Sequence, residues 1–339
     1  SLNNFHLDYI FGIIVTFYLF SIYFIFRNLL NIYDYNYFLK IILFSVFISS
    51  LMGILGWFLQ QFEINNIFAF NYEYPLKIGK SARANGTFST PSMLAIHIIT
   101  CFIILISLKE NLKFYKIFVS VYSLCLLLTF SKSILLLILI YLIYSFKKFS
   151  NKIFKFLIFS SFIIVFLSQI FFTNIMIIKN NKNYDWLADR SNAYIPTNAK
   201  PILEINNYYV YFTNYGYLKL KNFEIISENF PNGIGFRNFD NYEVLKYKSL
   251  PAFDPHSNYL GIISEFGVLG LISLFLLLFY LIKESKTYYH EKNLSFIYLF
   301  IIYILIESIN TDLISFKILW IVAAILVSIK QKQKIINNS

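Results

Sequence analysis

Residues 254–270 read Asp-Pro-His-Ser-Asn-Tyr-Leu-Gly-Ile-Ile-Ser-Glu-Phe-Gly-Val-Leu-Gly, and they join the longest polar segment of the chain to an apolar run of membrane-spanning length. Pro255 suits the first position of a helix, and Asp254 before it can cap the free backbone N–H groups. This pattern predicts that His256 lies in the first helical turn, beside the positive end of the helix dipole. An imidazole there is biased toward its neutral form and can act as a base near pH 7. The plain alternative is an ordinary histidine at the membrane–water boundary.

Apolar runs dominate the rest of the chain. Of its 339 residues, 58% are hydrophobic, and the mean hydropathy is +0.60, which excludes an ordinary soluble protein. Apolar segments of roughly the length of a transmembrane helix recur along it. They are 8–26, 37–59, 91–108, 113–130, 133–146, 153–178, 257–281, 294–309 and 315–329. We therefore expect an all-α, polytopic membrane protein forming one domain over 1–339, in which residues 179–255 are an outer loop insertion with short surface helices.

The placement of lysine and arginine orients these segments. With the N-terminus outside, 15 of the 29 Lys and Arg residues and only four of the 18 Asp and Glu residues fall on the inner side. The inner side then carries the whole net charge of +11 in short loops, as the positive-inside rule predicts. The basic character therefore needs no nucleic-acid partner. This orientation places segments 60–90 and 179–255, together with His256, on the outer face.

Three basic residues of the outer segments stand beside expected helix ends or glycine turns. Arg83 precedes a helix start that Thr90 and Pro91 predict, as cap and first helical residue. Lys132 lies in a short polar turn between two apolar runs, and Arg237 follows a Gly-Ile-Gly turn. A guanidinium beside the free N–H groups of a helix start is suited to bind a phosphate or pyrophosphate. We take Arg83 as the first candidate for such a site.

Four short motifs follow one another on the expected outer face. They read Arg-Ala-Asn-Gly-Thr-Phe-Ser-Thr-Pro (83–91), Thr-Phe-Ser-Lys-Ser (129–133), Glu-Asn-Phe-Pro-Asn-Gly-Ile-Gly (228–235) and Pro-His-Ser-Asn-Tyr-Leu through Glu-Phe-Gly-Val-Leu-Gly (255–270). In this order they resemble the Arg-x-x-Gly-Thr-Phe-x-Asn-Pro, Thr-x-Ser-Arg, Glu-Asn-Pro-x-Gly-x-Gly and His-Asn-x-Tyr-Leu…Glu-x-Gly-x-x-Gly motifs of the O-antigen ligase/polymerase family, which are bacterial membrane glycosyltransferases. The resemblance covers residues 80–330, most of the chain.

Two positions depart from the family pattern. The family carries an arginine ahead of its Glu-Asn-Pro motif, and the corresponding position here holds Tyr215, with Lys219 in place of a nearby tryptophan. Arg190 and Lys219 are the candidates to replace that arginine. Lys132 stands where the family has arginine, and an ammonium is a point charge that lacks the planar, bidentate fork. Both departures concern the binding of the donor.

The resemblance implies a GT-C-like transferase that moves a glycan from an undecaprenyl-diphosphate carrier to an acceptor hydroxyl, at the periplasmic face of the bacterial inner membrane. It implies that Arg83, helped by Lys132 and Arg237, binds the diphosphate, that His256 is the catalytic base, and that Asn258 binds substrate. The reaction is expected to invert the anomeric centre and to need no metal or other cofactor, since no carboxylate cluster marks a metal site. Lipid A core, a carrier-linked glycan and a protein are the acceptors left open, and with them ligase and polymerase activities.

The main alternative is a membrane transporter or flippase for a lipid-linked saccharide. Against it, the sequence shows no pair of interrupted apolar segments with charged residues near the midplane of the bilayer, where secondary transporters bind. A membrane scaffold is a third interpretation, and it leaves the placement of the outer basic residues unexplained.

Polar and small residues within the apolar segments have plainer interpretations. Glu265, Gly267 and Gly270 are interpreted as packing features that let another helix approach closely. His97 is interpreted as a core residue. Glu307 lies near the outer end of the eighth segment and is either a functional intramembrane carboxylate or a solvated interfacial one. Both alternatives for Glu307 stay open.

Overall fold

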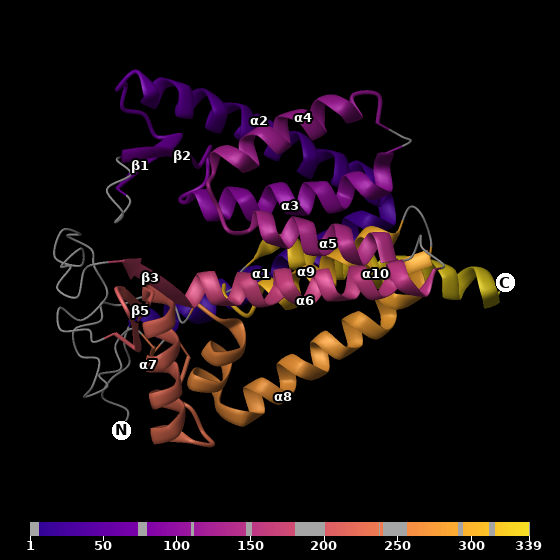
Figure 1. Cartoon of the computed structure of the whole chain (residues 1–339). Helices are drawn as coiled ribbons and strands as arrows, with labels where there is room; N and C mark the ends of the chain where they lie inside the picture. The colour runs from indigo at the N-terminus through magenta and orange to yellow at the C-terminus, as the bar shows by residue number, and fades with distance from the viewer. Residues whose placement is uncertain are drawn as a thin grey trace. The chain divides into compact units, whose positions relative to one another are not determined.

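The computed structural model describes residues 7–73, 80–109, 112–146, 151–179, 201–236, 238–239, 256–290, 294–311 and 316–338. These residues are mostly helical, as predicted (Figure 1). The chain divides into two compact units, each built from separated segments. Unit 1 comprises Ser1–Ile32, Ile170–Glu284 and Ile304–Ser339, and unit 2 comprises Tyr33–Gln169 and Ser285–Tyr303. The single domain over 1–339 with an insertion at 179–255 stays a prediction.

Each of the nine apolar segments coincides with a helix. The helices are α1 (Leu7–Ile32), α2 (Tyr35–Gln61), α3 (Pro91–Leu108), α4 (Tyr115–Leu128), α5 (Ile134–Phe146), α6 (Lys152–Asn174), α8 (Asn258–Lys286), α9 (Ser295–Glu307) and α10 (Lys317–Asn338). A further helix, α7 (Asn214–Asn229), lies within residues 179–255, and the 3-10 helix η2 (Thr287–His290) follows α8. The predicted 153–178 segment is too long, because α6 ends at Asn174 and a strand follows it.

Three helices among the described residues are long and apolar enough to cross a membrane: α2, α3 and α8. Shorter apolar helices cover Phe17–Ile32, Tyr115–Leu128, Ile134–Ser145 and Ser295–Glu307. These helices indicate a membrane protein. The nine crossings, and the orientation assigned to them, stay predictions.

Short strands correct the all-α expectation. In unit 2, β1 (Ala69–Glu73) pairs antiparallel with β2 (Lys80–Ala84), and Phe70 lies opposite Arg83. In unit 1, β3 (Ile175–Lys179), β5 (Tyr208–Phe212) and β4 (Leu203–Ile205) form an antiparallel sheet in the order β3-β5-β4. Strands β3 and β5 are rich in Ile and Tyr, which fit a pleated, half-buried surface. The aromatic residues of β5 therefore belong to a sheet.

Helix α3 is the core of unit 2. Its start follows the predicted pattern, since the side chain of Thr90 caps it by accepting from Met93 N and Pro91 occupies its first turn. Most of its residues are buried. The hydroxyl of Tyr303 in α9 donates to the carbonyl of Ile96, at 3.4 Å, and the Oγ of Ser107 accepts from a backbone N–H of the same helix α9. Packing on all sides fixes α3 and the segments that enter it.

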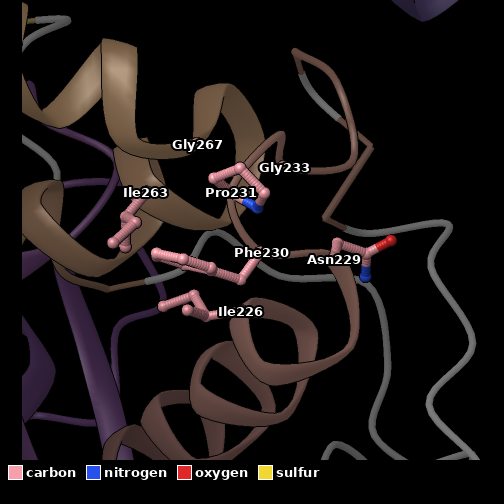
Figure 2. Close-up of a pocket in the computed structure, with 7 residues that line it drawn as sticks. All are labelled: Ile226, Asn229, Phe230, Pro231, Gly233, Ile263 and Gly267. Carbon is pink, nitrogen blue, oxygen red and sulfur yellow. The ribbon is translucent and has the colours of Figure 1, made fainter.

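Helix α8 in unit 1 is broken at Gly267, whose φ is +68° and ψ −160°. The loop that follows α7 lies across the break, and Figure 2 shows Pro231 and Gly233 of this loop beside Gly267. The backbone N–H groups of Ile234 and Gly235 donate to the carbonyls of Ser264 and Glu265, at 2.9 and 2.8 Å, and Val268 N donates to the carbonyl of Pro231 at 2.9 Å. The loop thus replaces the hydrogen bonds that the helix loses at the break.

The packing interpretation of Gly267 therefore needs correction in one respect. The close neighbour that requires glycine is the loop after α7, with the nearest atom, the Pro231 carbonyl oxygen, 2.1 Å from where a Cβ would stand. It is not another helix. The small pocket drawn in Figure 2 is lined by Ile226, Asn229, Phe230, Pro231, Gly233, Ile263 and Gly267, and it leaves no room for a water molecule. We interpret this region as a close packing contact between the loop after α7 and helix α8, and not as a ligand site.

Candidate functional site

Arg83 and Lys132 come together in unit 2. Arg83 belongs to β2 and is half-buried, and its Nε donates to the carbonyl of Thr129, at 2.7 Å. Thr129 is the C-cap of α4, and Lys132 lies in the turn between α4 and α5. We expected the guanidinium at the start of α3; its Nε binds at the end of α4 instead, 46 residues along the chain. Two motifs that the sequence presents separately thus form one cationic cluster.

The residues around Arg83 are held by α2. The indole N–H of Trp57 donates to the carbonyl of Ala82, at 3.0 Å, next to Arg83. Beyond the strand, the N–H and the hydroxyl of Thr87 both donate to the hydroxyl oxygen of Ser49, at 3.0 and 2.9 Å. Gly86 has a φ of +57°, and a Cβ there would stand 2.4 Å from the Ser49 carbonyl oxygen. Only glycine suits this position, so the Arg-x-x-Gly spacing has a structural cause.

The turn that carries Lys132 is also closely held. The hydroxyl of Thr129 donates back to the carbonyl of Leu126 at 2.7 Å and accepts from the N–H of Ser131 at 3.3 Å. The hydroxyl of Ser131 donates to that of Ser133, at 3.0 Å. Thr129, Ser131 and Ser133 are buried, whereas Lys132 between them is exposed. The Thr-x-Ser-x-Ser pattern therefore fixes a turn that presents one ammonium group to the surroundings.

The cationic cluster is electrostatically costly. Loss of hydration, and then the positive charge of Arg83, lower the pKa of Lys132 to about 8, although its side chain is exposed. A protein gains nothing in stability by holding two like charges in this way. Fixed cations that are already partly stripped of water are, however, what a phosphate or diphosphate group needs from a binding site. The cluster is therefore a candidate anion site.

The lowered pKa predicts the pH dependence of anion binding at this cluster. Since ammonium is the form that attracts an anion, affinity for inorganic pyrophosphate should fall as the pH rises through about 8. Between pH 7 and pH 9, one unit below and one unit above that pKa, the charged fraction of Lys132 falls by about tenfold. Titration calorimetry on the full-length protein in nanodiscs measures this change.

Lys132→Arg is the matched control for that titration. Arginine keeps its charge over the whole range, so the ratio of the wild-type and variant affinities removes the titration of pyrophosphate itself. The ratio should fall by about tenfold between pH 7 and pH 9. A constant ratio would show that Lys132 does not contact the anion.

His256 lies in unit 1, outside helix α8. The helix begins at Asn258, and His256 has a φ of +49°, so the prediction that it lies in the first helical turn is wrong. The left-handed backbone is costly for a residue with a side chain, and such strain gathers at functional sites. The imidazole is half-buried, and it meets the ring of Tyr215 edge to face, with 4.7 Å between the ring centroids. Asp254 and Pro255, the predicted cap and first residue, lie outside the described residues.

Asn258 ties the residues after His256 to the end of α9. Its N–H donates to the carbonyl of Ser308 at 2.9 Å, and its Nδ2 donates to the Ser308 hydroxyl at 2.7 Å. The hydroxyl of the next residue, Tyr259, donates to the carbonyl of Leu305 at 2.8 Å. Asn258 is 5% exposed, so its amide already serves this internal contact. The structure thus places Asn258 where it fixes the backbone at His256, and its predicted contact with substrate stays a prediction.

A second polar cluster surrounds the end of α9 in the same unit. The ammonium of Lys219 in α7 donates to Oδ1 of Asn310, at 2.5 Å, and interacts electrostatically with Glu307. Loss of hydration lowers the pKa of Lys219 to about 8, and the charge of Glu307 opposes that shift. Glu307 is 4% exposed. The solvated alternative for Glu307 is therefore wrong.

Arg237 and Arg190 lie outside the described residues. His97, predicted to be a core residue, is part-buried in unit 2: its Nδ1 lies 2.8 Å from the carbonyl of Met93, and its ring lies 4.2 Å from that of Phe88. In the described part of the chain, no group of three or more His, Cys, Asp and Glu side chains is placed to hold a metal ion. Comparison with protein-family models, with curated proteins and with solved structures finds no match for this chain.

Proposed function

We propose that this protein transfers a glycan from an undecaprenyl-diphosphate carrier to an acceptor hydroxyl at the outer face of the bacterial inner membrane, as an enzyme of the O-antigen ligase/polymerase type. The observation that carries the proposal is the pairing of Arg83 with Lys132 at the α4–α5 turn. Two cations held side by side at a cost indicate a site built for an anion. The diphosphate of a lipid carrier is an anion that a membrane protein meets at the surface of the bilayer.

The charge that develops during the reaction supports this assignment. When the bond between the anomeric carbon and the carrier breaks, its electron pair goes to the leaving diphosphate, which gains negative charge. Cations fixed before the reaction stabilise that charge without having to reorganise. Arg83 is anchored by its Nε at the carbonyl of Thr129, and Lys132 adds a second cation from a fixed turn.

His256 is the proposed base for the acceptor. It takes the proton of the acceptor hydroxyl while that oxygen bonds to the anomeric carbon, in one displacement that inverts the configuration. Tyr215 on one side and the Asn258–Ser308 contact on the other hold the residue in place. A histidine in a strained backbone conformation, next to a rigidly held helix start, favours such a role over that of an ordinary interfacial residue.

One observation favours the alternative of a transporter for a lipid-linked saccharide. Interrupted membrane helices are a feature of transporters, because the exposed backbone groups bind the solute, and α8 is interrupted at Gly267. In this chain, however, the carbonyls of Ser264 and Glu265 accept from the loop after α7. These carbonyls are already engaged, so the break is better explained by the fold than by a transported solute.

Arg83→Ala tests the proposed function in a deletion strain that is complemented with the variant. We expect glycan transfer to fall by about 10²-fold or more, since a cation that stabilises the leaving group is lost. Glycan profiling by gel and mass spectrometry measures the result. If long chains remain linked to the carrier but are no longer attached, the enzyme is a ligase. If all long chains disappear, it is a polymerase.

Arg27→Ala, a substitution in α1, is the matched control and should leave the glycans unchanged. A transporter gives a different result from both enzymes, because carrier-linked glycan then accumulates on the inner leaflet, where a membrane-impermeant label cannot reach it. Wild-type glycans from Arg83→Ala, at an equal level of protein, would overturn the proposed function.

A further inference from the structure

Helix α7 presents two side chains on the face that meets His256. Tyr215 and Lys219 are four residues apart, so they lie one above the other on one face of the helix. Tyr215 is 38% exposed and contacts the imidazole, and Lys219 is half-buried. An accessible aromatic ring therefore contacts His256, and an ammonium group lies about one helical turn further along the same face of α7, within unit 1.

Buried residues at the end of α9 hold the ammonium in place. Lys219 donates to Asn310, whose N–H donates to the carbonyl of Glu307 at 2.9 Å. The hydroxyl of Thr311 donates to Oε1 of Glu307 at 3.0 Å. The electrostatic interaction with Glu307 offsets part of the charge of Lys219, unlike the pair of like charges at Arg83 and Lys132.

Packing does not explain why the second carboxylate oxygen of Glu307 is buried. Within the described part of the chain, Oε2 has no hydrogen-bond partner although it is fully buried. A buried carboxylate oxygen without a partner costs free energy, and a membrane protein keeps such a group mainly where it has a task. The task that the contacts indicate is to position Lys219 and to neutralise its charge.

We propose that Tyr215 and Lys219 form a carbohydrate-binding subsite beside His256, with Glu307 and Asn310 as positioning residues. This inference rests on the proposed glycan transfer, and it names the chemical group that is recognised beside His256. The aromatic ring packs against the C–H face of a pyranose, and the ammonium donates to its hydroxyl oxygens. A cation beside a carboxyl group suits an uncharged, hydroxyl-rich ring, whereas the pair of cations suits the diphosphate. The ring belongs to the donor glycan or to the acceptor glycan.

Binding of free oligosaccharides to the full-length protein in nanodiscs tests the inference. Two probes are used: the glycan released by mild acid from the carrier-linked lipid of the deletion strain, and the core oligosaccharide released from its lipid A. We expect Tyr215→Ala and Lys219→Met to weaken binding of one of these probes by about tenfold or more. The probe that is affected identifies the source of the ring, and titration calorimetry gives both affinities.

Matched variants separate recognition from loss of structure. Tyr215→Phe keeps the ring and should bind the oligosaccharide as the wild type does, and Tyr208→Ala removes a tyrosine of β5 that is 45% exposed and should have no effect. Glu307→Gln, which keeps the size of the side chain, should weaken oligosaccharide binding and leave pyrophosphate binding unchanged.

The inference falls if Tyr215→Ala and Lys219→Met bind both probes as tightly as the wild type, or if neither probe binds the wild type at millimolar concentration. This result leaves the proposed function standing, because glycan transfer is tested separately through Arg83. The opposite combination is also distinguishable. Loss of oligosaccharide binding in Tyr215→Ala and Lys219→Met supports the subsite, whereas normal glycan transfer by Arg83→Ala overturns the proposed function.

Discussion

Replacing His256 with alanine is expected to reduce glycan transfer by about 10²–10⁴-fold, which is the usual contribution of a general base. The acceptor hydroxyl is a weak nucleophile, and without a base it must lose its proton to water. The fold should tolerate the change, since His256 precedes α8 and the start of that helix is held by Asn258. Alanine removes the edge-to-face contact with Tyr215, a contribution of only about 1 kcal/mol.

Turnover of purified carrier-linked glycan by the protein in nanodiscs measures this effect. His290→Ala, a substitution in η2, is the control for loss of a histidine as such. Binding of inorganic pyrophosphate to His256→Ala should equal that of the wild type, because the cationic cluster belongs to the other unit. Unchanged turnover in His256→Ala would falsify the assignment of the base, and loss of pyrophosphate binding as well would indicate a folding defect.

The helices were predictable from the sequence because their cause is local. A long apolar run can satisfy its backbone in a membrane only as a helix, so hydropathy alone locates these elements. The start of α3 was also predictable, since Thr90 and Pro91 act within one turn. The same logic failed at α8, where the pattern of Asp254 and Pro255 placed the helix start too early. The contact that fixes Asn258 as the first residue comes from Ser308, 50 residues away.

The strands and the clusters depend on distant partners, and a single sequence shows no sign of them. β3 and β5 pair residues that are 29 to 37 positions apart, so the aromatic-rich segment 208–212 by itself gives no indication of a sheet. The Arg83–Thr129 and Lys219–Asn310 contacts join residues 46 and 91 positions apart. The sequence shows which charged residues are candidates for binding, but it does not show which residues lie beside them in the fold. For this reason the sequence alone does not assign a role to Lys219 or to Glu307.

Gly267→Ala is expected to lower the free energy of unfolding by about 3 kcal/mol or more. The backbone at Gly267, with φ +68° and ψ −160°, lies in a region that only glycine adopts readily, and forcing alanine into it costs about 1–3 kcal/mol. The Cβ adds a second cost, since it would stand 2.1 Å from the carbonyl oxygen of Pro231 and 2.6 Å from the carbonyl carbon of Asn232. Both atoms belong to backbone and cannot rotate away, so the loop must leave the break in α8.

Displacement of that loop removes the N–H donors of Ile234 and Gly235 from the carbonyls of α8. The two halves of the helix then lose the hydrogen bonds that stabilise the break. His256 precedes the first half of the helix, and glycan transfer should therefore fall together with stability. Thermal unfolding in detergent, followed by circular dichroism, measures the first effect, and turnover measures the second. Leu269→Ala is the matched control: it lies two residues beyond the break, is 78% exposed, and should change the midpoint little. A midpoint for Gly267→Ala equal to that of this control would mean that the loop does not lie across the break, and the positions assigned to Gly233 and Gly267 in the motifs would then need another explanation.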